Sequence, residues 1–531
     1  MNQDSLWYKD AVFYELSVRA FKDSNGDGHG DLRGVTEKLD YLRQLGVNCI
    51  WLMPIYVSPL KDDGYDIADY YNIAESFGTL DDFKDLIKEA HHRHIRIIMD
   101  LVLNHTSDEH PWFQSARADR NSPYRDYYVW SDSDQYYKEA RIIFLDTERS
   151  NWTWDEQAGQ FFWHRFYSSQ PDLNYDNPKV QEEMFNIAQF WLELGIDGFR
   201  ADAVPYLFER EGTNCENLPD THFYLKRLRA FIDEHYPGRI LLCEANQWPE
   251  DVRPYFGNGD EFHMGFHFPI MPRIFMAMKK GRADDMIEIL NRTPPIPDNC
   301  QWCIFLRNHD ELTLEMVTPE ERQWMWEQYA PEPRMRLNLG IRRRLAPLLD
   351  NDRHKIELIN SLLFTLPGSP IIYYGDEIGM GDYIDLPDRN GVRTPMQWDD
   401  SPNAGFTTGQ PFAELVAGEL DYQHINVKDQ LADRNSLFHT ISQMIQTRKE
   451  YHAFGRGTME WAITDNPSLV AYSRKYRDEN LLILHNLSDS AQSLTVPSEH
   501  QTTYVDLLAN REREVASMMT LRPYEYLWLK R

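Results

Sequence analysis

Short apolar runs, each suited to one strand, alternate along the chain with segments in which apolar residues recur at helical spacing. Phe83, Leu86, Ile87 and Ala90 fall at i, i+3, i+4 and i+7 of one such segment. A repeated strand-then-helix order predicts an α/β fold in which the strands close into a (β/α)8 TIM barrel. The eight strand-like runs are residues 12–21, 49–54, 95–104, 197–204, 239–246, 261–268, 303–310 and 370–379.

Two long segments interrupt this alternation. Residues 105–176 follow the third run, are rich in Trp, Tyr, Asp and Ser, and are too long for a simple connection, so they predict an inserted small domain. A second excursion, at about 311–350, predicts a subdomain after the seventh strand. From residue 457 short strand-like runs replace the alternation and predict an antiparallel β domain at 457–531. The barrel is then expected at 1–104 and 177–456.

Composition narrows the classes of partner. Lys and Arg number 55 against 84 Asp and Glu, and a net charge of −29 disfavours nucleic acid and anionic membranes. The charged N-terminal residues and the lack of any 18-residue apolar stretch predict a cytoplasmic protein. Five cysteines are too few and too odd in number for a disulfide framework, so buried thiols are expected, the Cys300/Cys303 pair included.

Polar side chains follow the apolar runs where a barrel strand would end. The carboxyl ends of barrel strands meet at one mouth, where barrel enzymes keep their active sites, so these residues are expected to converge. They come from the third, fourth, fifth and seventh runs, and they are Asp100, Asn104, His105, Arg200, Asp202, Glu244, His309 and Asp310.

Three of these residues suit the cleavage of a glycosidic bond with retention of configuration. That chemistry needs a carboxylate nucleophile and a second carboxyl group that acts as acid and then as base, and Asp202 and Glu244 lie on neighbouring predicted strands. Arg200, two residues earlier on the same strand face, is expected to keep Asp202 ionised. Glu244 is expected to stay protonated, and Asp310 to bind sugar hydroxyls. Taken singly each could be a structural ion pair, but the whole set argues against that reading.

Four segments carry a family resemblance: "DLVLNH" at 100–105, "GFRADAV" at 198–204, "LLCEANQW" at 241–248 and "LRNHDE" at 306–311. They resemble the signature regions of the α-amylase family of glycoside hydrolases, and "QPDLN" (170–174), "GYDIADY" (64–70) and "GVRTPMQW" (391–398) resemble its branch that acts on small α-glucosides. The resemblance implies Asp202 as nucleophile, Glu244 as acid/base and Asp310 as transition-state stabiliser. As substrate-binding residues it implies Arg200, His105, His309, the stacking platform Tyr65, and a clamp of Asp66 and Arg393.

Within the family, residues 205–222, 266–278 and 334–352 resemble the members that interconvert maltose and trehalose through a covalent glucosyl-enzyme, with side hydrolysis to glucose. A charged clamp at the closed end of the pocket would admit only one glucosyl unit and so select disaccharides. Three rivals stay open: an α-glucosidase or oligosaccharide hydrolase of the same family, a silent sugar-binding subunit, and a metal-dependent barrel hydrolase. A homo-oligomer and a maltokinase partner are also left open.

Two structural calcium sites are expected, and no organic cofactor. The run "DSNGDGHGD" (23–31) spaces Asp23, Asn25, Asp27 and Asp31 in a way that can surround a hard cation, although an Asx-Gly turn explains it too. The resemblance adds the backbone carbonyl of His29. It also implies a second site formed by Asn104, Asp172, Glu209 and the backbone carbonyls of Tyr206 and Leu207.

Overall fold

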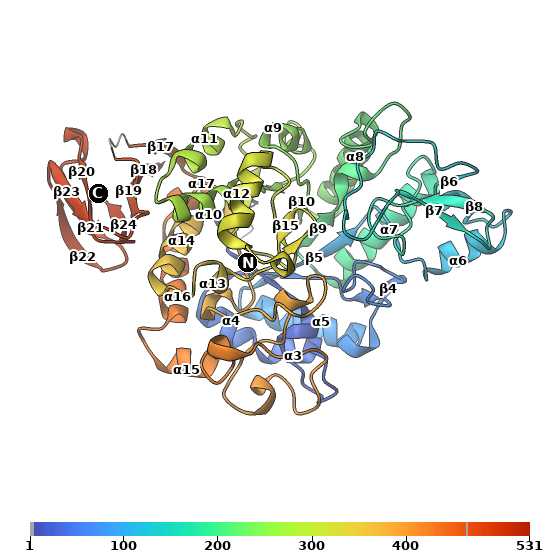
Figure 1. Cartoon of the computed structure of the whole chain (residues 1–531), viewed down its shortest axis with the longest axis horizontal. Coiled ribbons are helices and arrows are strands. Elements are labelled where there is room, and N and C mark those ends of the chain that lie inside the picture. The colour runs from blue at the N-terminus through green and yellow to red at the C-terminus, as the bar shows by residue number, and fades with distance from the viewer. Residues whose placement is uncertain (1–4, 463–465) are drawn as a thin grey trace.

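A closed barrel of eight parallel strands forms the centre of the computed structural model, which describes residues 5–462 and 466–531 (Figure 1). Each strand overlaps one apolar run predicted from the sequence, so the barrel prediction is confirmed. In order around the barrel the strands are β1 (Phe13–Leu16), β16 (Ser369–Tyr373), β12 (Gln301–Phe305), β11 (Met264–Phe266), β10 (Ile240–Cys243), β9 (Gly198–Asp202), β5 (Arg96–Val102) and β2 (Cys49–Leu52).

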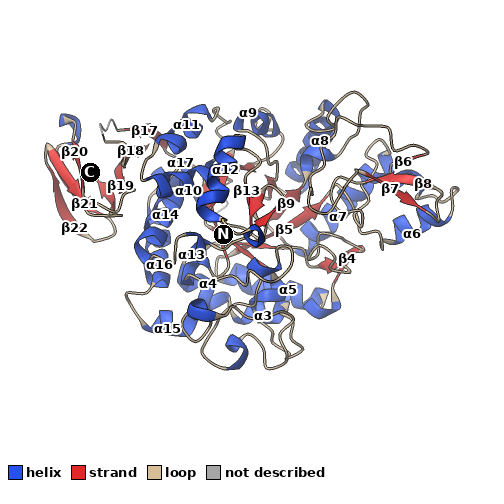
Figure 2. Ribbon diagram, in the orientation of Figure 1, coloured by secondary structure: helices blue, strands red, loops and turns tan. Residues whose placement is uncertain are grey.

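Helices surround the barrel, as Figure 2 shows. Local sequence explains where they begin and end: Thr79 and Asp82 form a capping box at the start of α5, and α7 begins with the Asn177 cap and Pro178 and ends at Gly195 in the left-handed conformation. The longer barrel helices are α5 (Leu80–His92), α7 (Pro178–Leu194), α8 (Pro219–His235), α10 (Ile270–Lys280), α11 (Asp284–Arg292), α14 (Arg353–Thr365) and α16 (Leu437–Glu450).

Two small sheets lie in the long connections. In the segment after β5, the strands β6 (Trp130–Ser131), β8 (Gln160–Trp163) and β7 (Trp152–Asp155) form an antiparallel sheet next to α6 (Pro111–Ala118). After β12, the strands β13 (Leu312–Thr313), β15 (Gly340–Ile341) and β14 (Arg336–Leu337) form a second sheet together with α12 (Pro319–Tyr329). Both connections leave the same end of the barrel, where strands finish, so they can build walls around its mouth.

The C-terminal part is an antiparallel β domain, as the sequence predicted. Alternate side chains such as Leu482, Leu484 and Leu529 form a buried cluster of their own within it. Its six-stranded sheet contains β17 (Thr458–Trp461), β18 (Leu469–Tyr476), β19 (Glu479–Asn486), β24 (Tyr526–Lys530), β21 (Thr502–Asp506) and β22 (Arg511–Val515), and β20 (Gln492–Thr495) pairs with β23 (Met518–Leu521). Across the described ranges 5–462 and 466–531, no helix combines the length and the apolar character needed to cross a membrane.

Candidate active site

The buried side chain of Arg200 contacts three carboxyl groups at the bottom of the barrel mouth. Arg200 on β9 is 1% exposed, and its guanidinium contacts Asp100 on β5 at 2.5 Å, Asp202 at 2.5 Å and Glu244 at 2.6 Å. The parallel register places Asp100 directly beside Arg200. A buried charge is tolerated when it is paired and hydrogen-bonded, which explains why an arginine can end a core strand here. The carboxyl oxygens of Asp202 and Glu244 thus contact two different nitrogens of the same guanidinium, Nη1 and Nη2.

The two carboxyl groups of this pair have different pKa values. Burial raises the pKa of Asp202 to about 6, even though Arg200 acts to lower it. Burial also raises the pKa of Glu244, and the negative charges of Asp202 and Asp310 help to bring it to about 7 although Arg200 opposes them. The expected protonated Glu244 is therefore supported near neutral pH. The expected effect of Arg200 on Asp202 is present, but burial outweighs it.

The chain turns sharply immediately after Asp202. Ala203 has φ 50° and ψ 35°, a left-handed conformation that a residue with a Cβ rarely adopts. Its backbone N–H donates a hydrogen bond of 3.1 Å to Glu244 Oε2. The turn therefore holds the carboxyl group of Glu244 next to that of Asp202.

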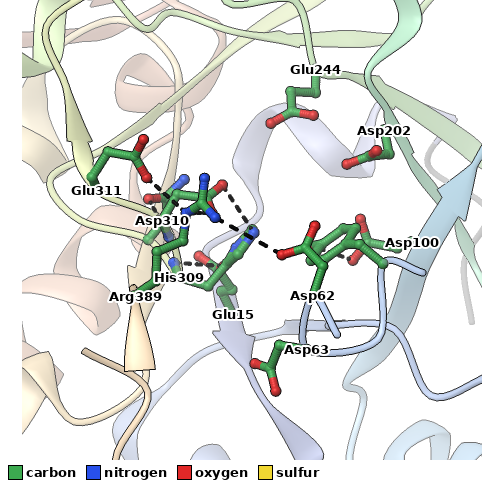
Figure 3. Close-up of polar contacts among 12 residues, drawn as sticks. Glu15, Asp62, Asp63, Asp100, Asp202, Glu244, His309, Asp310, Glu311 and Arg389 are labelled. Atoms are coloured by element: carbon green, nitrogen blue, oxygen red, sulfur yellow. Dashed lines mark hydrogen bonds and ion pairs between the residues drawn. The ribbon is translucent and has the colours of Figure 1, made fainter. Parts of the chain in front are cut away.

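Asp310 occupies the opposite side of the mouth, as Figure 3 shows. One of its oxygens contacts Arg389 Nε at 2.9 Å and Arg393 at 3.2 Å, and the other contacts His309 Nε2 at 3.1 Å. Although burial acts to raise the pKa of Asp310, His309 and Arg389 hold it well below its usual range. β12 ends at Phe305, earlier than the predicted run, so His309 and Asp310 lie on the loop that follows it.

Aromatic rings and a neutral histidine complete the floor. The Tyr65 ring stacks on His309 with centroids 5.2 Å apart and planes 16° from parallel. Burial lowers the pKa of His105 to about 3, so this side chain is neutral and can donate or accept a hydrogen bond. Tyr65, His105, Asp202, Glu244, His309 and Asp310 all line one pocket, whose empty space is about 830 Å³ with its open mouth included.

The two insertions close one wall of this pocket. Arg141, from the connection after β5, contacts Glu216 at 2.8 Å, Glu315 at 2.7 Å and the Tyr206 hydroxyl at 3.1 Å. Arg165 from the same connection also reaches Glu216, at 2.9 Å. Tyr206 and Glu315 line the pocket themselves. Three connections that are distant in the sequence are therefore joined by one largely buried ionic network beside the site.

The structure does not bring Asp66 to Arg393, so the expected clamp of these two residues is a wrong prediction. Asp66 is fully buried in its own loop, where it accepts hydrogen bonds from the Ser58 hydroxyl at 2.9 Å and the backbone N–H groups of Lys61 and Asp62 at 2.9 and 3.0 Å. These bonds hold the carboxyl group inside the loop, away from the pocket.

Asp62 and Asp63, rather than Asp66, are the carboxylates that contact the arginines here. Arg393 contacts Asp63 at 3.5 Å, and Arg389 contacts Asp62 at 3.9 Å. Asp62 lines the pocket, and burial raises its pKa to about 7 while Arg389 and Arg393 act to lower it. The sequence pattern did not single out Asp62, Asp63 or Arg389, although "DDGYD" and "DRNGVR" contain these charged residues next to recognised positions.

The second expected calcium set contains buried oxygens without a hydrogen-bond partner among the described residues. Asn104 Oδ1, Asp172 Oδ2 and Glu209 Oε1 are buried, and within the described part of the chain they accept no hydrogen bond. Burial raises the pKa of Asp172 to about 8, and burial followed by the charge of Asp172 raises the pKa of Glu209. Unpaired buried carbonyl and carboxylate oxygens are the ligands that Ca2+ prefers.

In the first expected set of calcium ligands, the side-chain oxygens of Asp23 and Asp27 already accept hydrogen bonds within their own loop. Asp23 accepts hydrogen bonds from the backbone N–H groups of Asn25, Gly26 and Gly28, and Asp27 accepts one from His29. Asp31 caps α3 (Leu32–Glu37) instead. Residues 5–462 and 466–531 contain no cluster of three or more His, Cys, Asp or Glu side chains placed to hold a metal. The loop is explained by its own Asx turns, so the second set carries the case for calcium.

Comparison with known proteins agrees with this geometry. The family described as alpha amylase, catalytic domain, matches residues 16–330 and 341–457, and the alpha-amylase SusG C-terminal domain matches residues 469–525. Trehalose synthase/amylase TreS of Mycobacterium tuberculosis is 55% identical, over 99% of this chain and 90% of its own length. Oligo-1,6-glucosidase of Bacillus cereus is 32% identical, over 99% of this chain and 100% of its own.

A solved structure shares the whole architecture. The trehalulose synthase MutB of Pseudomonas mesoacidophila MX-45 superposes with a TM-score of 0.80 at 29% identity, over 99% of each chain. The closed barrel, the antiparallel C-terminal sheet and the carboxylates at the barrel mouth are thus found together with a family match over most of the sequence. The chain belongs to the α-amylase family of glycoside hydrolases.

Proposed function

We propose that the chain interconverts maltose and trehalose by moving one glucosyl unit between two positions of the same glucose. The observation that carries this proposal is the pocket, which has a carboxylate pair at its floor and is walled by two insertions joined through Arg141. A pocket walled in this way can retain the released glucose long enough for a second transfer. The relatives named trehalose synthase support the same reading, since the one from Mycobacterium tuberculosis is 55% identical.

In the first step Glu244 gives its proton to the glycosidic oxygen of maltose. Asp202 attacks the anomeric carbon from the opposite side, the bond to the leaving glucose breaks, and a β-linked glucosyl ester forms on Asp202. A pKa of about 7 lets Glu244 hold this proton near neutrality, and a pKa of about 6 leaves Asp202 largely ionised there.

In the second step the freed glucose turns within the pocket and presents its anomeric hydroxyl to the ester. Glu244 now accepts the hydroxyl proton, the new bond forms and the ester breaks, so Asp202 is returned as a carboxylate. The reaction is reversible because the bonds made and broken are alike. Water that reaches the ester in place of glucose gives hydrolysis instead, so the exclusion of water decides the product.

Asp310 supplies negative charge where the sugar ring becomes positive. His309, Arg389 and Arg393 keep this carboxyl group ionised and hold its two oxygens in place. Preorganised charge of this kind stabilises a transition state without reorganisation during the reaction. Tyr65, stacked on His309, offers its ring to the sugar face.

We expect activity to be bell-shaped in pH. As pH falls below about 6 Asp202 becomes protonated and stops being a nucleophile, and as pH rises above about 7 Glu244 loses the proton that the leaving group needs. The optimum of kcat/KM should therefore lie between these values. Initial rates of trehalose formation from pH 4.5 to 9 check this, and a flat profile up to pH 9 contradicts the role of Glu244.

Replacing Arg141 by alanine should raise the share of hydrolysis. The change leaves Glu216 and Glu315 without this partner and opens the wall that separates the ester from solvent. We expect the ratio of glucose to trehalose to rise several-fold, since a lost charged hydrogen bond of about 1.5–3 kcal/mol favours the open wall. Arg120, which donates to the backbone carbonyls of Ala158 and Gly159 within the same insertion, provides the control Arg120→Ala. An unchanged ratio in Arg141→Ala would disprove this role for the network.

A hydrolase acting on α-glucosides or oligosaccharides is the second candidate, because the same carboxylates would serve it. Its support is weaker, since the oligo-1,6-glucosidase is 32% identical against 55% for the trehalose synthase. The deciding experiment incubates the purified protein separately with maltose and with trehalose and identifies products by NMR. Interconversion supports the proposal, whereas glucose alone from both sugars supports the hydrolase.

We also propose a structural Ca2+ at Asn104, Asp172 and Glu209, with the backbone carbonyls of Tyr206 and Leu207 as further ligands. A cation there would pair three buried oxygens that otherwise accept no hydrogen bond in the described chain. Asn104 follows β5 and Glu209 follows β9, so the ion would tie the inserted segment to the barrel. The ion would act on stability, because the carboxylates at the barrel mouth account for the chemistry.

Calcium should therefore raise the melting temperature, and a chelator should lower it. At 100 times its Kd a ligand that binds only the folded state adds about 2.7 kcal/mol, which is several degrees for a domain of this size. Glu209→Gln should lose the response, while Asp27→Asn in the other loop should keep it. Equal melting temperatures with Ca2+ and with chelator would contradict the site. The cytoplasmic location, a homo-oligomer and a maltokinase partner stay predictions.

A further inference from the structure

His309 lies between two carboxyl groups. Its Nδ1 is 2.5 Å from Glu15 Oε1, and its Nε2 is 3.1 Å from Asp310 Oδ2. The backbone N–H of His309 also donates to Glu15 Oε1, at 3.2 Å. Figure 3 shows Glu15 beneath the histidine and Asp310 above it. Among the described residues, the hydrogen-bond partner of the Glu15 carboxyl group is His309.

With Glu15 and Asp310 both ionised, a doubly protonated imidazole is the form of His309 that can donate to both. A neutral imidazole has one N–H, so one of the two carboxylates would face a ring lone pair. The imidazolium donates from both nitrogens and satisfies Glu15 and Asp310 together. Burial alone would lower the pKa of His309, but the charges of Asp310 and Glu15 raise it to about 10. The electrostatics therefore agree with the geometry.

Glu15 itself lies in a setting where an isolated carboxylate would be unfavourable. It belongs to the core strand β1, is fully buried, and is paired in register with Trp51 on β2 and Tyr373 on β16. Burying a carboxylate in such a place costs several kcal/mol unless a charged partner compensates it. The imidazolium of His309 is that partner.

We propose that Glu15 is a positioning residue that keeps His309 doubly protonated, so that the ring holds Asp310 aimed at the reacting sugar. The expected effect on catalysis rests on the proposed function, whereas the charge state of His309 does not depend on it. In other proteins a carboxylate fixes the tautomer and the ring orientation of a histidine in this way. It thereby affects the group that the histidine contacts with its other nitrogen.

Other groups also face His309. The Tyr65 ring stacks on it and the Trp51 ring meets it edge-on. Asp100 is also near: burial raises its pKa to about 6, although Arg200 and His309 act to lower it. Arg393 donates to the carbonyl oxygen of His309 at 2.8 Å and opposes its protonation. Removing the charge of Glu15 thus weakens the field of negative charge around the ring but does not abolish it.

The test is Glu15→Gln, which keeps the shape and an oxygen that accepts from Nδ1–H but removes the charge. The pKa of His309 should fall, so its second proton is lost at a lower pH than in the unaltered protein. We expect kcat at pH 8 to drop about 10- to 100-fold with KM changed little, and the loss to shrink at pH 6, where the ring is protonated again. Dividing the kcat of Glu15→Gln by the kcat of the unaltered protein at each pH removes the effect of Glu244 ionisation, which is common to both. A ratio that does not vary with pH overturns the proposal.

Glu377→Gln is the matched control. Glu377 is also buried at the barrel, but it accepts hydrogen bonds from Tyr14 and Tyr41 at 2.7 and 2.5 Å and does not contact His309. Its replacement should change stability without a pH-dependent loss of kcat. In a His309→Asn background, Glu15→Gln should add no further loss, because the ring through which Glu15 acts is gone. An equal loss in both backgrounds contradicts the proposal.

Histidine NMR tests the charge state even if Glu15→Gln does not fold or the enzyme acts on another sugar. With ¹⁵N-labelled histidine, and His309 assigned as the signal missing in His309→Asn, both ring nitrogens should keep imidazolium shifts up to pH 9. A His309 signal that titrates below pH 7 overturns the proposal whatever the substrate. Imidazolium shifts combined with no activity on maltose or trehalose would instead count against the proposed function alone.

Discussion

Asp202→Ala will abolish both the isomerisation of maltose and its hydrolysis, with a loss in kcat of about 10⁴-fold or more. In the proposed mechanism both outcomes pass through a glucosyl ester on this residue, so no product should form without it. The alanine also removes one of the three carboxylates around Arg200, which leaves the guanidinium paired with Asp100 and Glu244. Product NMR with each sugar, at enzyme concentrations high enough to detect that loss, measures the effect.

Asp197→Ala is the matched control, because Asp197 immediately precedes the same strand at its opposite end. There it contacts His91 at 2.8 Å and accepts from the backbone N–H of Ile97 at 2.9 Å. Residues at that end of a barrel serve stability, so this variant should melt earlier but keep its product ratio. Isomerisation by a folded Asp202→Ala protein would refute the nucleophile assignment.

Glu244→Gln should lower turnover of maltose and trehalose by about 10²- to 10⁴-fold, because an amide cannot supply the proton that the leaving glucose needs. The loss should depend on the leaving group. With α-glucosyl fluoride, fluoride departs without a proton, so the first step should survive and the ester on Asp202 should accumulate.

Mass spectrometry of the intact protein after a short incubation with α-glucosyl fluoride detects that ester as one added glucosyl unit. The double variant Asp202→Ala/Glu244→Gln should show no such adduct, which links the signal to Asp202. An equal loss with maltose and with the fluoride would mean that Glu244 acts only through the shape or charge of the site, and its role as acid would be wrong.

The sequence alone was enough to predict the barrel strands and the residues that converge at their ends. Alternating strand and helix patterns are local, and a closed parallel barrel brings the ends of its strands to one mouth whatever the details of packing. Asp202, Glu244 and Asp310 were predictable for this reason, and the structure places all three in one pocket. The proposed calcium ligands Asn104, Asp172 and Glu209 were implied by resemblance, and the structure leaves an oxygen of each without a hydrogen bond in the described chain.

Only the tertiary structure decided which carboxylates meet the arginines and what charge each group carries. Asp62, Asp63 and Asp66 lie in one short loop, and the left-handed turn at Asp63 (φ 47°) and Gly64 (φ 105°) directs them differently, which no spacing pattern reveals. In the sequence Glu15 is a single charged residue within an apolar run. Only the pairing of β1 with β16 in the folded barrel places it beside His309. A pKa depends on burial and on neighbours from distant segments, so the opposite shifts of Asp202 and Asp310 emerge only when the barrel closes.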